Sequence, residues 1–361
     1  MLGKIEISLD QIKSNWTALN FASNGKAAAV VKADAYGFGM TRITKTLINA
    51  GCKYFYVANL DEAIEFRKKI INQDITIAVF EGFFEGTEIT YFNNKITPII
   101  NNLEQLKRLL KLSRQGKKIR AILNINTGMN RLGCNSKEIE FLQKNKNIVN
   151  ELEWDFIMSH LANSEDFENV INDNQLNKLL EFSEYFPDIK LSFANSCGIA
   201  LGSKFCLDQT RPGIGLYGVN GIGENIKLKS KDLKLPIKLY APIIQIKEVG
   251  IGEAISYGGI DITNRKSLLA TIGIGYADGW IRQLKKNTSI NIDKQQCKIM
   301  GNITMDSFVL DITKIKNKSL KEGDYLCLLD NYNIKDLLKK LDLISYELFT
   351  LMGSRLIRYY I

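Results

Sequence analysis

The chain has 361 residues, of which 45% are hydrophobic and 24% are charged. This balance is typical of a soluble globular protein, and the length suits a large domain followed by a smaller one. The formal net charge of +9 comes from lysines that alternate with acidic residues. Because no compact basic block with interleaved aromatic residues is present, the charge does not favour a nucleic-acid partner.

Cysteine usage and targeting signals exclude further classes of protein. The six cysteines are scattered without a CxxC pair, and His160 is the single histidine. This pattern disfavours a disulfide framework and a transition-metal site. The first ten residues mix charged with apolar side chains, and no stretch has the uninterrupted apolar length of a membrane span. We therefore expect a cytoplasmic protein with neither a metal nor a membrane partner.

The first two thirds of the chain repeat one unit, a short β-branched or aromatic run followed by an amphipathic segment. Eight such alternations predict a (β/α)8 TIM barrel over residues 1–232. The expected strands are residues 27–32, 54–58, 76–80, 97–100, 121–125, 155–159, 190–194 and 207–211.

The composition changes after Gly221, where a polar, lysine-rich stretch is typical of a linker. Extended segments broken by glycines then predict a mainly β C-terminal domain over residues 233–361. The expected strands are Ile237 to Val249, Ser267 to Ile274, Cys297 to Met300, Ser307 to Ile312 and Tyr325 to Leu329. Helical periodicity follows in Ile334 to Leu341 and in Tyr346 to Leu351.

Chemically distinctive residues follow several predicted barrel strands, where active sites of this fold form. They are Lys32, Arg131, His160, Asn195-Ser196 and Arg211. Each has an ordinary structural explanation; a strand-end lysine, for example, commonly packs its stem on the core and keeps its amine in water. Their occurrence at one rim favours an active site. In a partly desolvated mouth, the Lys32 amine would deprotonate more easily and form a Schiff base with a carbonyl.

A glycine motif follows the last predicted barrel strand. Gly213, Gly215 and Gly218 form a GxGxxG pattern, which in dinucleotide-binding proteins follows the first strand of a βαβ unit instead. Loops at the present position commonly hold a phosphate on backbone N–H groups. A phosphate site combined with an imine-forming lysine indicates pyridoxal phosphate as a cofactor.

Motifs along nearly the whole chain resemble the alanine racemase family of fold-type III pyridoxal-phosphate enzymes. They are VKADAYG (31–37), TGMNRLG (127–133), RPGIGLYG (211–218), SYG (256–258), GYADG (275–279) and MD (305–306). The resemblance implies a homodimer with shared active sites that interconverts L-alanine and D-alanine. Its D-alanine would feed peptidoglycan synthesis.

The resemblance also implies roles for individual residues. Lys32 would hold the cofactor covalently and act as one base, and Tyr257 of the partner subunit would act as the other. Arg211 would face the pyridine nitrogen, His160 would link Arg211 to Tyr257, and Asp306 would orient neighbouring groups. Arg131 and the backbone near Met305 would bind the substrate carboxylate, and Tyr276 would gate a narrow passage. The residues around the cofactor phosphate would be Tyr36, Ser196, Gly213, Ile214 and Tyr346.

Several positions depart from the family pattern. Asn124 stands where many members have a carbamylated lysine, whose negative charge braces Arg131. Without that charge, either a bound chloride holds Arg131 or Arg131 is more mobile. Phe38 replaces a frequent histidine, Thr304 replaces a frequent cysteine, and residues 353–358 lack a frequent proline. Two alternative functions are a racemase for other small amino acids, such as serine, and a non-catalytic pyridoxal-phosphate-binding protein. A third, decarboxylation, would require a different carboxylate environment.

Overall fold

The computed structural model describes residues 2–71, 74–221, 223–285, 289–292, 295–315 and 320–361. The chain forms two compact units. The barrel unit contains residues 12–220 and 225–233, and the β unit contains residues up to 11, residues 221–224 and residues from 234 onward. The domain boundary expected between residues 232 and 233 stays a prediction.

The barrel unit is built on a parallel sheet with strand order β2-β3-β4-β5-β6-β7-β8. Its strands are β2 (Ala29–Val30), β3 (Tyr54–Val57), β4 (Thr76–Val79), β5 (Thr97–Ile100), β6 (Ala121–Asn124), β7 (Trp154–Met158) and β8 (Leu191–Ser192). Strands β5 and β6 are buried along their whole length, as expected for a parallel sheet covered on both faces.

The eighth predicted strand, residues 207–211, is present only as isolated bridges. Thr210 pairs in parallel with Ala27 beside β2, and Gln209 pairs in parallel with Ser192 of β8. Because this segment joins both edges of the sheet, it closes the sheet into a barrel. The predicted α/β barrel followed by a mainly β domain is therefore confirmed, with a last barrel strand shorter than expected.

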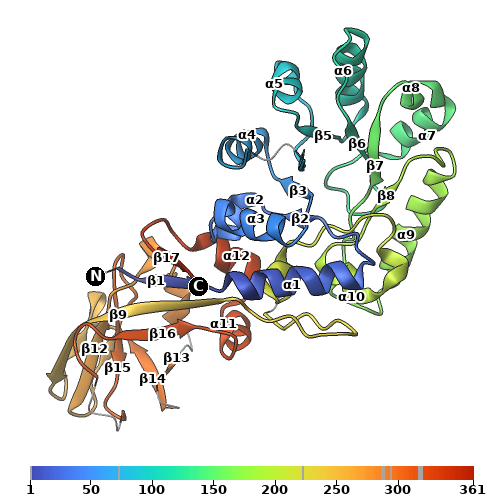
Figure 1. Ribbon diagram of the computed structural model, residues 1–361. Helices are drawn as coiled ribbons and strands as arrows, with labels where there is room; N and C mark the ends of the chain where they lie inside the picture. The colour runs from blue at the N-terminus through green and yellow to red at the C-terminus, as the bar shows by residue number, and fades with distance from the viewer. Residues whose placement is uncertain (1, 72–73, 222, 286–288, 293–294, 316–319) are drawn as a thin grey trace. The chain divides into compact units, whose positions relative to one another are not determined.

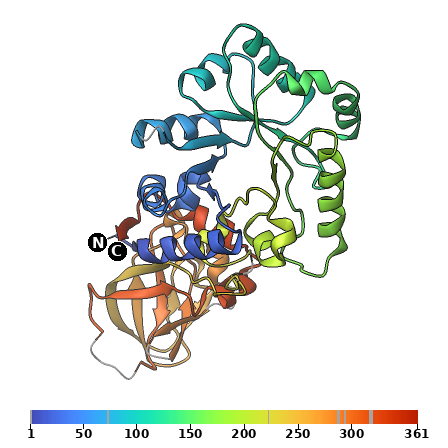
Figure 2. The same cartoon turned by 45° about the vertical axis from the view of Figure 1, so that its right-hand side comes forward.

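Helices surround the curled sheet on its outer side (Figure 1), and Figure 2 shows the same arrangement from a second direction. The helices are α1 (Leu9–Ala22), α2 (Lys32–Gly37), α3 (Met40–Asn49), α4 (Leu60–Lys69), α5 (Glu88–Asn93), α6 (Leu103–Arg114), α7 (Ser136–Lys144), α8 (Lys146–Asn150), α9 (Val170–Ser183), α10 (Ser196–Leu201), η1 (Ser203–Phe205) and η2 (Ile214–Tyr217). Asparagine caps begin five of them, at positions 59, 102, 135, 169 and 195, because the side-chain oxygen accepts an otherwise unpaired N–H of the first turn.

The β unit contains a mixed sheet with strand order β13-β14-β15-β12-β9-β1-β17, and β16 also pairs with β9. Its strands are β1 (Lys4–Ile7), β9 (Ile237–Val249), β12 (Ser267–Ile272), β13 (Ser289–Ile292), β14 (Gln295–Met300), β15 (Phe308–Asp311), β16 (Tyr325–Leu329) and β17 (Ile357–Tyr360). The remaining elements are the hairpin β10 (Ala254–Ile255) and β11 (Asp261–Ile262), η3 (Tyr257–Gly259), η4 (Tyr276–Asp278), η5 (Arg282–Lys285), α11 (Ile334–Leu341) and α12 (Ser345–Leu351).

The N-terminal strand β1 lies inside this sheet, antiparallel to β9 and parallel to β17. Within the described ranges, no helix combines the length and the apolar character needed to cross a membrane.

Candidate active site

The chain makes a strained turn directly after β2. Lys32 begins α2, and the four residues Ala33 to Tyr36 all have positive φ values between 52° and 60°. None of them is glycine, so this left-handed turn costs on the order of 1–2 kcal/mol per residue. Such strain persists only where the surroundings fix the backbone, and it commonly marks a functional site.

Polar contacts from other elements hold this turn. The Glu62 carboxylate of α4 accepts the Ala33 N–H (2.8 Å) and the Ala58 N–H (2.8 Å). Asp34 accepts the Met40 N–H (2.7 Å), and the Tyr217 hydroxyl donates to the Ala35 carbonyl. The turn thereby fixes the backbone at Lys32 against the barrel wall.

The electrostatic surroundings of Lys32 favour its neutral amine. Burial lowers the Lys32 pKa first, and the positive charge of Arg131 lowers it further, while the Glu62 carboxylate partly opposes both. The Nζ atom also lies 5.9 Å from the centre of the Phe80 ring. A lowered pKa makes the amine easier to deprotonate, and the deprotonated amine can attack an aldehyde or accept a proton.

Arg211 is a buried cation, 2% exposed, whose contacts are all uncharged. Its two terminal nitrogens donate to Ser192 Oγ (2.6 Å) and the Ser159 carbonyl (2.6 Å), and one of them also reaches the Phe193 carbonyl (3.2 Å). Its Nε–H is buried and has no hydrogen-bond partner among the described residues. Because buried donors are normally hydrogen-bonded, this N–H is suited to donate to a bound ligand atom with a lone pair, such as a pyridine nitrogen.

His160 is held next to Arg211, with its Nδ1 atom 3.4 Å from a terminal nitrogen of the guanidinium. Burial and the charges of Arg211, Arg131 and Lys32 lower the His160 pKa to about 3. The imidazole is therefore neutral at physiological pH. The three cations that act on His160 also show that Lys32, Arg131 and Arg211 share one electrostatic environment.

A small cradle lies between α10 and η2. The Ser196 Oγ atom accepts the N–H groups of Gly213 (3.0 Å) and Gly215 (2.9 Å). The Ile214 N–H makes no hydrogen bond within the described part of the chain. A Cβ atom added at Gly213 would lie 2.1 Å from the Tyr36 hydroxyl oxygen, so a glycine is needed for this close approach.

These residues fit a pyridine cofactor that carries an aldehyde and a phosphate. An amine with a lowered pKa, an unpaired buried N–H on Arg211 and a hydroxyl-lined cradle provide for these three chemical groups. By contrast, no group of three or more His, Cys, Asp or Glu side chains that could bind a metal ion occurs among the described residues.

Asn124 forms an amide pair instead of presenting a charge. Its Nδ2 atom donates to Asn101 Oδ1 (2.7 Å), and both side chains are buried. Asn101 in turn donates to the Phe80 carbonyl (3.0 Å). None of these contacts joins Asn124 to Arg131, so the choice between a bound chloride and a more mobile Arg131 stays a prediction.

The remaining predicted site residues belong to the β unit. Tyr257 lies in η3 and is 78% exposed. Its loop is fixed by Asn302, whose Nδ2 atom donates to the Tyr257 carbonyl (2.9 Å), and by Ser256, whose hydroxyl donates to the Asn302 carbonyl (3.2 Å). Tyr346 lies in α12, where its carbonyl accepts the Thr350 hydroxyl (2.8 Å).

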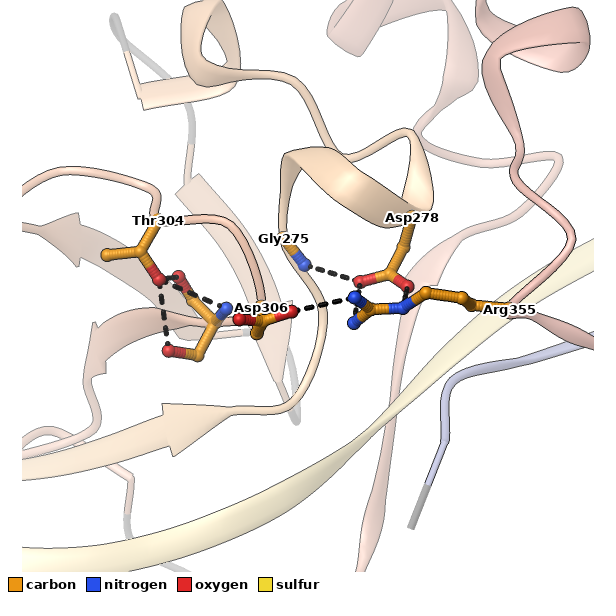
Figure 3. A network of polar contacts seen from close by, with 6 residues as sticks. Gly275, Asp278, Thr304, Asp306 and Arg355 are labelled. Atoms are coloured by element: carbon orange, nitrogen blue, oxygen red, sulfur yellow. Dashed lines mark hydrogen bonds and ion pairs between the residues drawn. The ribbon is translucent and has the colours of Figure 1, made fainter.

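A network of polar contacts joins the loops that carry Tyr276, Met305 and Asp306 (Figure 3). Arg355 pairs with Asp278 through Nε (2.9 Å) and with Asp306 through a terminal nitrogen (2.7 Å). Asp278 also accepts the Gly275 N–H (2.9 Å). A backbone hydrogen bond from the Tyr276 N–H to the Thr304 carbonyl (3.1 Å) joins the same loops.

The predicted site residues thus divide between the units. The barrel unit brings together Lys32, Tyr36, Arg131, His160, Ser196, Arg211, Gly213 and Ile214, and the β unit carries Tyr257, Tyr276, Met305, Asp306 and Tyr346. Sequence reasoning missed the supporting residues Glu62 and Arg355. The only signal for Glu62 was an acidic residue in a helical first turn, and Arg355 lay in a segment noted only for its lack of a proline.

Comparisons with known proteins agree on one family. The alanine racemase N-terminal domain family matches residues 7–221, and the alanine racemase C-terminal domain family matches residues 237–360. The chain is 37% identical over 343 residues to the alanine racemase of Rickettsia bellii, covering 94% of this chain and 83% of that protein. It is 35% identical over 371 residues to the alanine racemase of Brucella abortus, covering 99% and 93% of the two chains.

A solved structure extends this likeness to the fold. The crystal structure of alanine racemase from Bartonella henselae with covalently bound pyridoxal phosphate has a TM-score of 0.93, 34% sequence identity and full coverage of both chains. Both halves of the chain and the fold as a whole therefore lead to the same conclusion: this chain belongs to the alanine racemase family.

Proposed function

We propose that this chain interconverts L-alanine and D-alanine with pyridoxal phosphate as its cofactor. The observation that carries the proposal is the barrel rim, where a lysine with a lowered pKa shares one environment with a buried arginine that has one unpaired N–H. Family membership supports the same reaction, because the similar Bartonella henselae protein is an alanine racemase that binds this cofactor covalently.

The residues that would hold the cofactor follow from this arrangement. Lys32 would bind it covalently through Nζ, and the Arg211 Nε–H would donate to its ring nitrogen. Its phosphate would lie among Tyr36, Ser196, Gly213 and Ile214, and the resemblance to the family also assigns Tyr346 to the phosphate. When bound, pyridoxal phosphate supplies an electron sink for the charge left on the α-carbon after proton removal.

Arg211 also sets how strong that sink is. A guanidinium stays protonated and offers no acceptor, so it leaves the pyridine nitrogen without a proton and weakens electron withdrawal by the ring. A weaker sink limits side reactions such as transamination. The neutral His160 beside Arg211 would connect this cation to the phenol of Tyr257.

Inversion at the α-carbon requires two proton carriers on opposite faces of the substrate. The Lys32 Nζ atom would exchange the α-proton on one face. On the other face, the hydroxyl of Tyr257 of the partner subunit would do so. Each group removes the α-proton of one enantiomer, and the group on the opposite face then delivers a proton, so the configuration inverts.

Substrate recognition would use a cation and a tyrosine. Arg131 is exposed and follows β6, so its guanidinium can pair with the substrate carboxylate, assisted by the backbone at Met305. Tyr276 would limit the passage to small side chains, and Asp306 would keep its neighbours oriented.

A homodimer is part of this proposal. Tyr257 is 78% exposed, and the apolar side chains of Ile260 and Ile262 next to it on the same hairpin are 55% and 61% exposed. Exposed apolar side chains grouped in this way suit a protein contact, and a second copy of this chain would cover them. We further propose a cytoplasmic location and a role in supplying D-alanine for peptidoglycan.

Purified protein tests the proposal directly. Treatment with borohydride should fix the cofactor on Lys32, and the Lys32→Ala variant should show no fixed cofactor. Turnover of alanine, serine and lysine should be compared by an enantiomer-specific assay. Faster racemisation of serine would replace alanine as the substrate, and a protein that binds the cofactor without racemising any amino acid would contradict the enzymatic function.

The two-base assignment has its own test. Tyr257→Phe should keep the cofactor but block proton removal from one enantiomer only, which solvent-deuterium exchange into L- and D-alanine measures separately. Equal exchange into both enantiomers at the wild-type rate would rule out Tyr257 as a base.

A further inference from the structure

A row of buried polar side chains extends from Arg211 into the barrel. Ser192, Gln209 and Tyr56 are at most 6% exposed. Arg211 donates to Ser192 Oγ (2.6 Å), and the Ser192 hydroxyl lies 3.1 Å from the Gln209 carbonyl and 3.3 Å from Gln209 Oε1. The Tyr56 hydroxyl donates to the same Oε1 atom (2.5 Å). We refer to Tyr56, Gln209, Ser192 and Arg211 as the interior row.

The hydrogen bonds of the interior row start from the Arg211 end, where the donor is fixed. Arg211 has only donors, so Ser192 Oγ must accept from it, and its single proton is directed to Gln209, where the backbone carbonyl (3.1 Å) and Oε1 (3.3 Å) both lie within reach. Gln209 Oε1 therefore faces Ser192 and Tyr56 as an acceptor. The Tyr56 hydroxyl fixes the amide in this orientation, and the amide oxygen is one of the two Gln209 acceptors beside the serine hydroxyl that holds the guanidinium.

The interior row contributes no negative charge. In the described part of the chain, no carboxylate forms an ion pair with Arg211, and the nearest groups are neutral oxygens and the His160 ring. The barrel does accommodate an arginine–carboxylate pair elsewhere, because Asp155 pairs with Arg120 and accepts the Tyr54 hydroxyl (2.8 Å). A neutral amide, and not a carboxylate, stands at the Arg211 end.

Core filling alone does not explain this choice of residues. A buried cation with neutral partners is costly, since a nearby carboxylate would stabilise it. The cost is offset if a bound ligand accepts a hydrogen bond from the unpaired N–H of Arg211, whose positive charge no carboxylate neutralises.

We propose that Gln209, held by Tyr56, is a positioning residue that acts through Ser192 to aim the Arg211 Nε–H at the ring nitrogen of the cofactor without supplying a counter-ion. This inference rests on the proposed function, because it takes pyridoxal phosphate as the ligand of Arg211. Gln209 and Tyr56 touch neither cofactor nor substrate in this assignment.

The test compares two cofactors that differ at one atom. Apoprotein is titrated with pyridoxal phosphate and with its analogue in which the ring nitrogen is replaced by C–H, and both dissociation constants are measured by fluorescence quenching. A hydrogen bond from a charged donor gives the wild type a preference of about 10-fold or more for the nitrogen-containing cofactor. In Gln209→Met, which has a similar shape but no hydrogen bond, the preference should fall toward one.

Two tyrosine variants separate positioning from simple core damage. Tyr56→Phe deletes the hydroxyl that holds Gln209 and should also lower the preference, and it serves as the second variant if Gln209→Met does not fold. Tyr54→Phe deletes a hydroxyl from the neighbouring, partly buried ring, whose centre lies 5.2 Å from that of Tyr56, and this hydroxyl donates to Asp155 and not to the interior row. It should keep the wild-type preference while losing stability.

The outcomes distinguish the inference from the proposed function. A wild type that prefers neither cofactor, or a folded Gln209→Met or Tyr56→Phe protein with the wild-type preference, overturns the role of the interior row even if alanine is racemised. A protein with the expected preferences that racemises no amino acid supports the row and contradicts the proposed function instead.

Discussion

The Nε atom of Arg355 lies 2.9 Å from Oδ1 of Asp278, a carboxylate that is only 6% exposed. The same guanidinium reaches Asp306 on a second loop (2.7 Å), as Figure 3 shows. Asp278 ends the short helix that begins at Tyr276, and Asp306 follows Met305 directly. One arginine therefore braces both segments of the β unit that carry proposed substrate-facing residues.

Replacing Arg355 should impair catalysis more than folding. In Arg355→Ala, the loops at Tyr276 and Met305 lose a shared partner, and a misplacement of this kind lowers kcat/KM by about 10-fold or more. Steady-state kinetics with both enantiomers measures the effect. Arg265→Ala is the matched control, because it removes an exposed ion pair with Asp311 (2.6 Å) in the same unit. Equal kinetics in the two variants would contradict the bracing role.

Gly213 should tolerate no Cβ atom while Tyr36 keeps its hydroxyl. The added atom would lie 2.1 Å from the Tyr36 Oη, so Gly213→Ala should cost about 1–3 kcal/mol of overpacking and weaken cofactor binding. In the Tyr36→Phe background, the nearest remaining atoms are 3.1 Å and 3.3 Å away, and the cost should shrink. A double-mutant cycle on cofactor affinity and urea unfolding checks this coupling. Additive effects would show that Tyr36 does not cover Gly213.

Local patterns predicted many elements because their signals lie within the element. Residues 237–249 and 325–329 alternate or group their apolar side chains, and β9 and β16 have the predicted bounds. The place of β1 had no such signal. Its partners are Ile237 to Tyr240 and Ile357 to Tyr360, and pairing at this sequence separation leaves no trace in the short run Lys4 to Ile7.

The candidate site shows the same division. The occurrence of Lys32, His160 and Arg211 at strand ends could be predicted, because parallel barrel strands end at one rim. The left-handed turn at residues 33–36 could not, since alanine and tyrosine disfavour it, aspartate adopts it only as a single residue, and its support comes from Glu62 and Tyr217. The unpaired Arg211 N–H likewise depends on contacts from several strands.

Removal of the Arg131 charge should make Lys32 harder to deprotonate. Arg131 lowers the Lys32 pKa, so in Arg131→Met that pKa should rise toward its ordinary value while burial still lowers it. The rate at which apoprotein takes up pyridoxal phosphate, measured against pH, should then have its midpoint at a higher pH. Arg114→Met is the control, because Arg114 is exposed and paired with Glu151 (2.6 Å). An unchanged or lower midpoint in Arg131→Met would exclude the coupling.

His160 should make the protein less stable in mild acid. Its pKa is lowered to about 3 in the folded state from an ordinary value of 6.5, so below pH 6.5 the unfolded chain binds a proton that the folded chain refuses. Stability should therefore fall as the pH drops from 7 to 5, by about 2 kcal/mol from this group. No other histidine contributes, because His160 is the single one in the chain. His160→Gln should lose this part of the pH dependence in urea unfolding, and the wild-type imidazole proton resonances should stay constant from pH 8 to 5. Resonances that titrate with a midpoint near 6.5 would place His160 in water instead of beside Arg211.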